Sequence, residues 1–287
     1  MHIYSINNTS HSYSYNNYNN INFGVNLNSR KLQFRADDFY VNIRGYGHHS
    51  GWAQKIKETA DNAVKFIREK CDFEGTLKNI TQGVTEANQL PLDIFKRQHT
   101  GILRIPRDGW RYGSDWSDQF GLITRYSNHK SNRYNTYADR LNQTINKPLE
   151  NPYSDIELTR PKKDNFYGNF IEHANPIYIN SAFKRVNSLY DEIYNKYILK
   201  EAKKENLEDI NSLIAEMRWI LAHATPWERG SDAISNTFIR SIYKAIGIKT
   251  HPLKKGISLD LEAYCTNLKD YKNNFADYFS KKPEIVE

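Results

Sequence analysis

One short segment of the sequence combines side chains that could carry out chemistry. It runs Leu221-Ala-His-Ala-Thr-Pro-Trp-Glu-Arg-Gly-Ser-Asp-Ala-Ile234. His223 is a candidate acid–base catalyst, because histidine changes its charge near neutral pH without any shift of its pKa. Glu228 is the second candidate for this role. The alternative is an ordinary tight turn between two core helices, in which these side chains only pack or face water.

The residues that follow this histidine are suited to binding an anion. Gly230 permits a sharp turn, and Ser231 is a good N-cap for a following helix. The amides at the start of that helix would point towards a bound phosphate. Arg229 and Arg240 could bind phosphate in a bidentate manner, and Trp227 could form a wall of the pocket. We therefore predict a binding site for the phosphates of a donor at this turn.

The order of these residues resembles a degenerate Fic motif, which reads His-Pro-Phe-x-x-Gly-Asn-Gly-Arg and opens a helix. Here an apolar helix is followed by Pro226-Trp-Glu-Arg-Gly-Ser231 and by an amphipathic helix that carries Arg240. The resemblance covers this segment directly and residues 170–280 in their helical surroundings. Thr225 stands at the position of the Fic histidine, and Ser231-Asp-Ala233 replaces Asn-Gly-Arg. Threonine is not a base near neutral pH, and His223 lies two residues too early, so standard AMP transfer is not expected.

A missing Fic histidine, a helical core and a basic charge are also features of the AvrB family of plant-pathogen effectors, which this sequence resembles. Those effectors are similar to Fic proteins in fold and are linked to sugar transfer onto host proteins. The resemblance implies a Fic/Fido-like helical bundle, a nucleotide or nucleotide-sugar donor and a host protein as the acceptor.

The composition suits a globular protein with anionic partners. The chain has 287 residues, with 40 Lys and Arg against 33 Asp and Glu, which gives a formal net charge of +7. Its two cysteines, Cys71 and Cys265, match no metal or redox spacing, and we interpret them as small buried hydrophobic residues. His48 and His49 lack a third ligand at a suitable spacing, so no metal site is expected. No apolar run is long enough to cross a membrane.

The N-terminal region, residues 1–30, is predicted to be disordered. Residues 3–29 contain no Asp, Glu, Lys or Arg and are rich in Asn, Ser and Tyr. They lack the pattern of a cleaved signal peptide. This composition suits an uncleaved export signal, so we expect secretion by that route and action in the cytoplasm of a host cell. A tail without a function is the alternative.

The rest of the chain is predicted to be mainly α-helical, with a small β component in its N-terminal half. We expect a mixed α/β region over residues 31–160 and a helical region over residues 161–287 that carries the site. Apolar residues recur at helical spacing over 53–71, 183–197, 210–221 and 234–246, with Gly75 and Gly247 as helix ends. Further helices are predicted near 137–146 and over 261–279, and short strands over 32–36, 39–43, 102–106 and 121–125.

Two other functions have some support in the sequence. Arg35 resembles the first-strand arginine of ADP-ribosyltransferases, and that reading requires Arg35 to share a cleft with a carboxylate such as Glu262. The aromatic and basic region around residues 104–134 could bind single-stranded nucleic acid, but no known nucleic-acid-binding module is recognisable there.

The sequence therefore predicts a bacterial effector or toxin that transfers a group from a nucleotide or nucleotide-sugar donor onto a host protein. A non-catalytic adaptor that binds a host protein is the alternative, and the substitution at Thr225 favours it. The ADP-ribosyltransferase is the third hypothesis.

Overall fold

The computed structural model describes residues 29–39, 50–70, 72–90, 98–108, 111–115, 135–165, 168–200 and 202–286. Several expectations lie outside these residues. They are the disorder of residues 1–28, the strands over 40–43 and 121–125, the His48-His49 pair and the burial of Cys71.

The described chain is mainly helical, as predicted. The longer helices are α1 (Ser50–Lys70), α2 (Phe73–Gln89), α5 (Asn135–Asn146), α6 (Ile179–Ile193), α7 (Leu207–Ala224) and α8 (Ser231–Ile246). Two short helices, α9 (Leu259–Cys265) and α10 (Leu268–Asn274), lie near the C-terminus. A π-helical turn, Tyr194–Ile198, extends α6, and 3₁₀ turns occur at Arg30–Leu32, Ala36–Phe39, Pro176–Tyr178, Lys204–Asn206 and Phe275–Tyr278. None of the described helices is long and apolar enough to cross a membrane.

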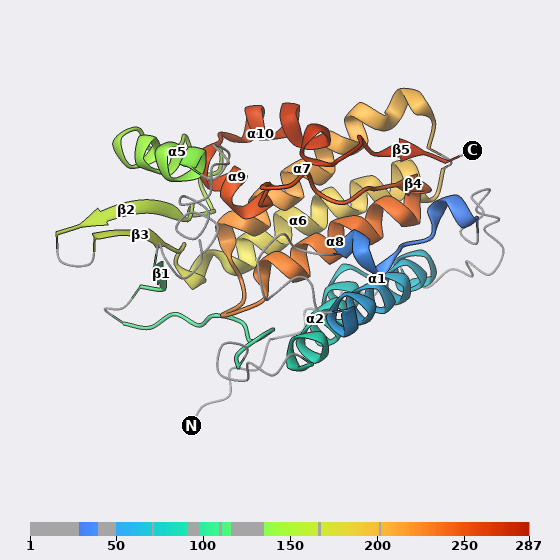
Figure 1. Ribbon diagram of the computed structural model, residues 1–287, viewed down its shortest axis with the longest axis horizontal. Coiled ribbons are helices and arrows are strands. Elements are labelled where there is room, and N and C mark those ends of the chain that lie inside the picture. Colours follow the sequence, from blue (N-terminus) through green and yellow to red (C-terminus); the bar gives the residue numbers. More distant parts are fainter. Residues whose placement is uncertain are drawn as a thin grey trace.

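Helices α6, α7 and α8 lie at the centre of the molecule and are covered from two sides (Figure 1). α1 and α2 pack against α8 on one side, and α5, α9 and α10 lie on the other. One hydrophobic cluster extends from Phe34 to Phe279, so residues from both halves of the chain form a single core. α7 and α8 are deeply buried helices: every residue over 217–224 and over 237–246 is buried, including the polar residues Arg218, Arg240 and Lys244.

A small antiparallel sheet lies at one end of this helical body (Figure 1). Its strands are β1 (Gly113–Asp115), β2 (Arg160–Asp164) and β3 (Gly168–Glu172), in the order β1-β3-β2. β2 and β3 form a hairpin in which Pro161 lies opposite Ile171. A separate two-stranded sheet joins β4 (Ile248–Lys249) to β5 (Glu284–Ile285) near the C-terminus.

The structure corrects four of the predicted elements. Residues 32–36 are not a strand, because Leu32 ends one 3₁₀ turn, Ala36 begins another and residues 33–35 connect them, and residues 102–106 join no sheet. The first helix ends at Lys70, and Gly75 lies inside α2. The helix predicted over 261–279 is divided into α9, α10 and a 3₁₀ turn, because the chain leaves the helical conformation at Thr266 and Asn267 caps α10 through its side chain.

Candidate functional site

The predicted turn between α7 and α8 is present. α7 ends at Ala224, and Thr225 adopts a left-handed conformation (φ 38°, ψ 61°) directly before Pro226. A proline disfavours the α-helical conformation of the residue before it, which explains why α7 ends here. Gly230 has φ 87°, and a Cβ atom there would lie 2.9 Å from Thr100 Cγ2. Glycine is therefore needed both for the backbone conformation and for the close approach of Thr100.

Ser231 does not cap α8, contrary to the prediction. The N-cap position is Gly230, and Ser231 is the first helical residue. Its hydroxyl lies 3.1 Å from the main-chain oxygen of Trp227 and 3.3 Å from the main-chain nitrogen of the same residue. The Ser231 hydroxyl therefore bonds to the main chain of the turn.

His223 is buried in the last turn of α7. Its ring lies between Trp219 and Tyr264, with ring centroids 4.1 Å and 5.7 Å away. Nδ1 is 3.2 Å from the main-chain oxygen of Thr159, and Nε2 is 3.1 Å from that of Ala263. Burial lowers the pKa of His223 to about 3, although the two main-chain oxygens oppose this shift. The ring is therefore neutral at physiological pH and has no nitrogen directed towards a surface.

The other predicted residues of the turn have separate surroundings. Trp227 is buried and packs 5.9 Å from the ring of Phe183. Glu228 lies beside His99, with Oε2 2.9 Å from His99 Nδ1. Arg229 is exposed. None of these three side chains lines either of the two cavities described below.

Arg240 lies further along α8 and serves the fold. Its guanidinium donates to the main-chain oxygens of Asp38 and His251, and its Cζ atom lies 5.0 Å from the centre of the Phe39 ring. Burial lowers its pKa to about 10, so it keeps its charge at neutral pH. It lines a small cavity of about 70 Å³ together with Asp232. Arg229 is not among the residues that line this cavity.

Residues 98–108 form a second layer over the turn, which the sequence did not reveal. The amide of Gly101 donates to the carbonyl of Arg229, and the amide of Glu228 donates to Ile102. The amide of Arg104 donates to the carbonyl of Pro226, at 2.9 Å. This pairing brings the side chain of Arg104 to Thr225.

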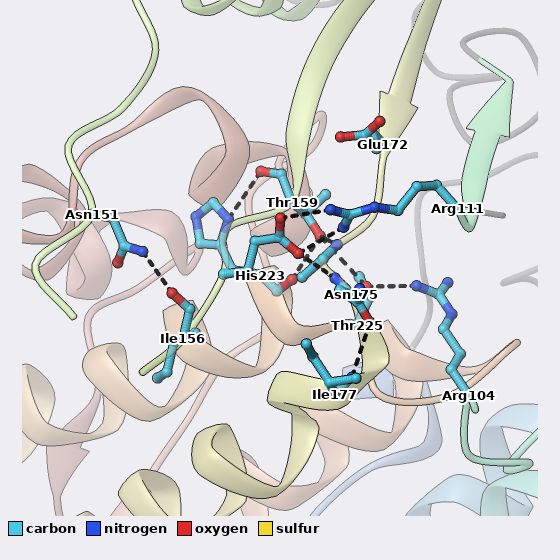
Figure 2. A network of polar contacts seen from close by, with 12 residues as sticks. Arg104, Arg111, Asn151, Ile156, Thr159, Glu172, Asn175, Ile177, His223 and Thr225 are labelled. Carbon is cyan, nitrogen blue, oxygen red and sulfur yellow. Dashed lines mark hydrogen bonds and ion pairs between the residues drawn. The ribbon is translucent and has the colours of Figure 1, made fainter. Parts of the chain in front are cut away.

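Arg104 is a buried cation whose guanidinium is directed towards Thr225 (Figure 2). It is 8% exposed, and NH1 donates to Thr225 Oγ1 at 2.6 Å. Its Cζ atom lies 5.2 Å from the centre of the Tyr112 ring. Among the described residues Nε has no hydrogen-bond partner, and no carboxylate forms an ion pair with this guanidinium. Burial lowers the pKa of Arg104 to about 10, so the group remains a cation at neutral pH.

Two threonines connect this arginine to a cavity beside α5 and β2. Thr159 Oγ1 donates to the His223 main-chain oxygen at 2.6 Å and lies 3.5 Å from Thr225 Oγ1 (Figure 2). Thr159 also lines a cavity of about 280 Å³ between α5, β2 and Tyr264. We call Arg104, Thr225 and Thr159 the arginine–threonine cluster.

The lining of this cavity favours an anionic ligand. Three of its described residues are basic, Arg160, Lys162 and Lys163, and none is acidic. Lys162 forms an ion pair with Glu172, at 2.7 Å, whereas Arg160 and Lys163 are exposed. Attraction to these cations raises the local concentration of an anion.

A second buried charge network holds the start of α8. The Arg218 side chain is completely buried and lies 2.5 Å from Asp232 and 2.8 Å from Asp260. Its Nε donates to Asn236 Oδ1 at 2.8 Å. Burial and then the charge of Asp260 raise the pKa of Asp232 to about 6, while Arg218 opposes this rise. Arg218, a charged residue within the apolar run Met217–Ala222, was the available sequence signal for this network.

The geometry required for the ADP-ribosyltransferase hypothesis is not present. Arg35 is exposed and pairs with Asp37. Glu262 is buried and accepts hydrogen bonds from Tyr137 and from Arg140. The two residues do not share a cleft. The described residues also contain no group of three or more side chains that could hold a metal ion.

A comparison with known families identifies the chain. The family model for AvrB/AvrC avirulence proteins matches residues 123–282, more than half of the 287 residues. The match includes the helices from α5 to α10, the β2–β3 hairpin and the turn at Thr225, while Arg104 lies before its start. No curated protein matches this chain. The chain therefore belongs to the AvrB/AvrC family of avirulence proteins, which are bacterial effectors.

Proposed function

We propose that this effector transfers a group from a nucleotide-type donor onto a host protein inside the host cell. The observation that carries the proposal is the buried guanidinium of Arg104, which forms no ion pair with a described carboxylate and is connected through Thr225 and Thr159 to the 280 Å³ cavity. A buried charge is costly unless it is paired, and a bidentate anion such as a diphosphate would pair with it.

The donor would lie in the cavity, with its phosphates directed towards the arginine–threonine cluster. The Thr225 hydroxyl, which accepts from Arg104, would donate to a phosphate at the same place, whereas Thr159 already donates to the His223 main-chain oxygen. Arg160 and Lys163 would attract the anion at the cavity rim. Arg229 and the Gly230–Ser231 start of α8 remain part of the proposal, because a Fic-like arrangement would hold donor phosphates at that turn.

A second candidate, a non-catalytic adaptor, is favoured by the lack of an available base at the turn. His223 has both ring nitrogens against main-chain oxygens, and Glu228 lies beside His99. Such an adaptor would bind a host protein without changing it.

Thermal unfolding tests donor binding. We expect one class among pyrophosphate, nucleoside diphosphates and nucleotide sugars to stabilise the full chain. At about 100 times its Kd, a ligand raises the free energy of unfolding by about 2.7 kcal/mol. The stabilisation should be smaller in Lys163→Gln at the cavity and unchanged in Lys78→Gln, a matched control at an exposed position of α2. If none of these compounds stabilises the protein, the adaptor becomes the better proposal.

A further inference from the structure

The strand pair β1–β3 brings a serine hydroxyl and an imidazole together. Ser114 lies opposite Ile171, so the two side chains share one face of the sheet. His173 follows Ile171 by two residues and continues this face. Ser114 Oγ lies 2.6 Å from His173 Nε2. His173 is 1% exposed, whereas Ser114 is partly exposed.

The environment of His173 keeps its ring neutral. Burial, and then the charge of Arg104, hold the pKa of His173 well below its usual value. In the tautomer with its proton on Nδ1, a neutral imidazole presents the Nε2 lone pair to the Ser114 hydroxyl. A nucleophile within hydrogen-bond reach of a base is the arrangement used in covalent catalysis by serine.

We propose that Ser114 is a nucleophile, activated by His173, that accepts acyl groups from carboxylic esters. The Oγ–C bond forms as the ester C–O bond breaks. The Ser114 proton passes to His173 Nε2 and then to the departing alkoxide, and water hydrolyses the acyl-serine to regenerate the hydroxyl. This activity is separate from the proposed donor transfer and does not rest on it.

The test is covalent labelling of the full chain with a fluorophosphonate probe, followed by peptide mass spectrometry. Ser280, an exposed serine, serves as the internal control in the same molecule. General-base assistance is worth about 100-fold or more in rate, so Ser114 should be labelled at least about 100 times faster than Ser280. Ser114→Ala should remove the fast adduct, and His173→Gln should reduce the Ser114 rate to that of Ser280. Equal rates at the two serines, or fast labelling of Ser114 in a folded His173→Gln variant, would overturn the proposal.

The pH dependence of labelling provides a second test that needs no variant. An unassisted serine reacts through its alkoxide and slows about tenfold for each pH unit lost. A serine assisted by an ordinary histidine slows below about pH 6.5, where the imidazole gains its proton. Because His173 stays neutral to lower pH, the Ser114 rate should remain constant from about pH 8 to pH 6. A tenfold fall over this range would contradict the activation by His173.

Discussion

Replacing Arg104 by methionine tests whether this residue is retained for binding and not for stability. Two opposing effects of the substitution can be estimated from the structure. The pKa of Arg104 falls from 12.5 to about 10, mainly through burial. At 1.36 kcal/mol per unit, burying this cation costs the folded protein about 3 kcal/mol. Because the folded pKa is the lower one, this cost is present at pH 7 and declines only as the pH rises through about 10 towards 12.5.

The lost contacts offset most of the gain from removing the charge. A hydrogen bond from a charged donor, here to Thr225, contributes about 1.5–3 kcal/mol, and the contact with the Tyr112 ring contributes about 0.5–1 kcal/mol more. The expected net change for Arg104→Met is therefore within about 1 kcal/mol of zero.

Arg218→Met is the matched control because Arg218 is also buried but has carboxylate partners. It would leave Asp232 and Asp260 facing each other, at a cost of about 3–5 kcal/mol. Urea unfolding followed by tryptophan fluorescence measures both free energies of unfolding. If Arg104→Met costs as much as Arg218→Met, Arg104 serves the fold and the reasoning is refuted.

Three further predictions concern stability. Gly230→Ala forces a left-handed alanine against Thr100, so urea unfolding should show a loss of about 1–2 kcal/mol or more. Burial and a neighbouring carboxylate raise the pKa of Asp232 from 3.8 to about 6, so the folded state binds this proton more tightly than the unfolded state does. The resulting stabilisation of the fold is fully present below about pH 4 and is lost as the pH rises through about 6. Relative to Asp232→Asn, the free energy of unfolding of the wild type should fall by about 1 kcal/mol between pH 4 and pH 6, a value reduced because the side chain is partly exposed. If the wild type and Asp232→Asn lose stability in parallel over this range, the pKa shift is excluded. Tyr137→Phe removes a donor from the buried carboxylate of Glu262 and should cost about 1–3 kcal/mol in the same unfolding assay; an unchanged midpoint would show that this hydrogen bond contributes little.

Local patterns were sufficient to predict the helical core and the turn. The apolar stripes over 183–197, 210–221 and 234–246 correspond to α6 with its π-helical turn, α7 and α8. Gly247 ends α8 with φ 99°, and Thr225 before proline ends α7. These features depend on neighbouring residues alone, which explains why the sequence reveals them.

Contacts between distant segments could not be predicted. The pairing of residues 98–108 with the turn leaves no periodic signal, so Arg104 was recognised only as one of many basic residues. The burial of His223 depends on Tyr264 and on the main chain of Thr159, which come from other parts of the chain. A spacing argument can place a histidine near a turn, but it cannot show which way the ring points.

The central claim is that the chain moves a group from a nucleotide-type donor to a host protein. The most direct measurement incubates the full chain with a host-cell extract and the donor identified by thermal unfolding, labelled in its transferable group. We predict that label appears in a host protein with the wild type and with Lys78→Gln, and is lost with Arg104→Met. If the donor binds but no host protein gains label, or if Arg104→Met transfers as well as the wild type, the account is contradicted.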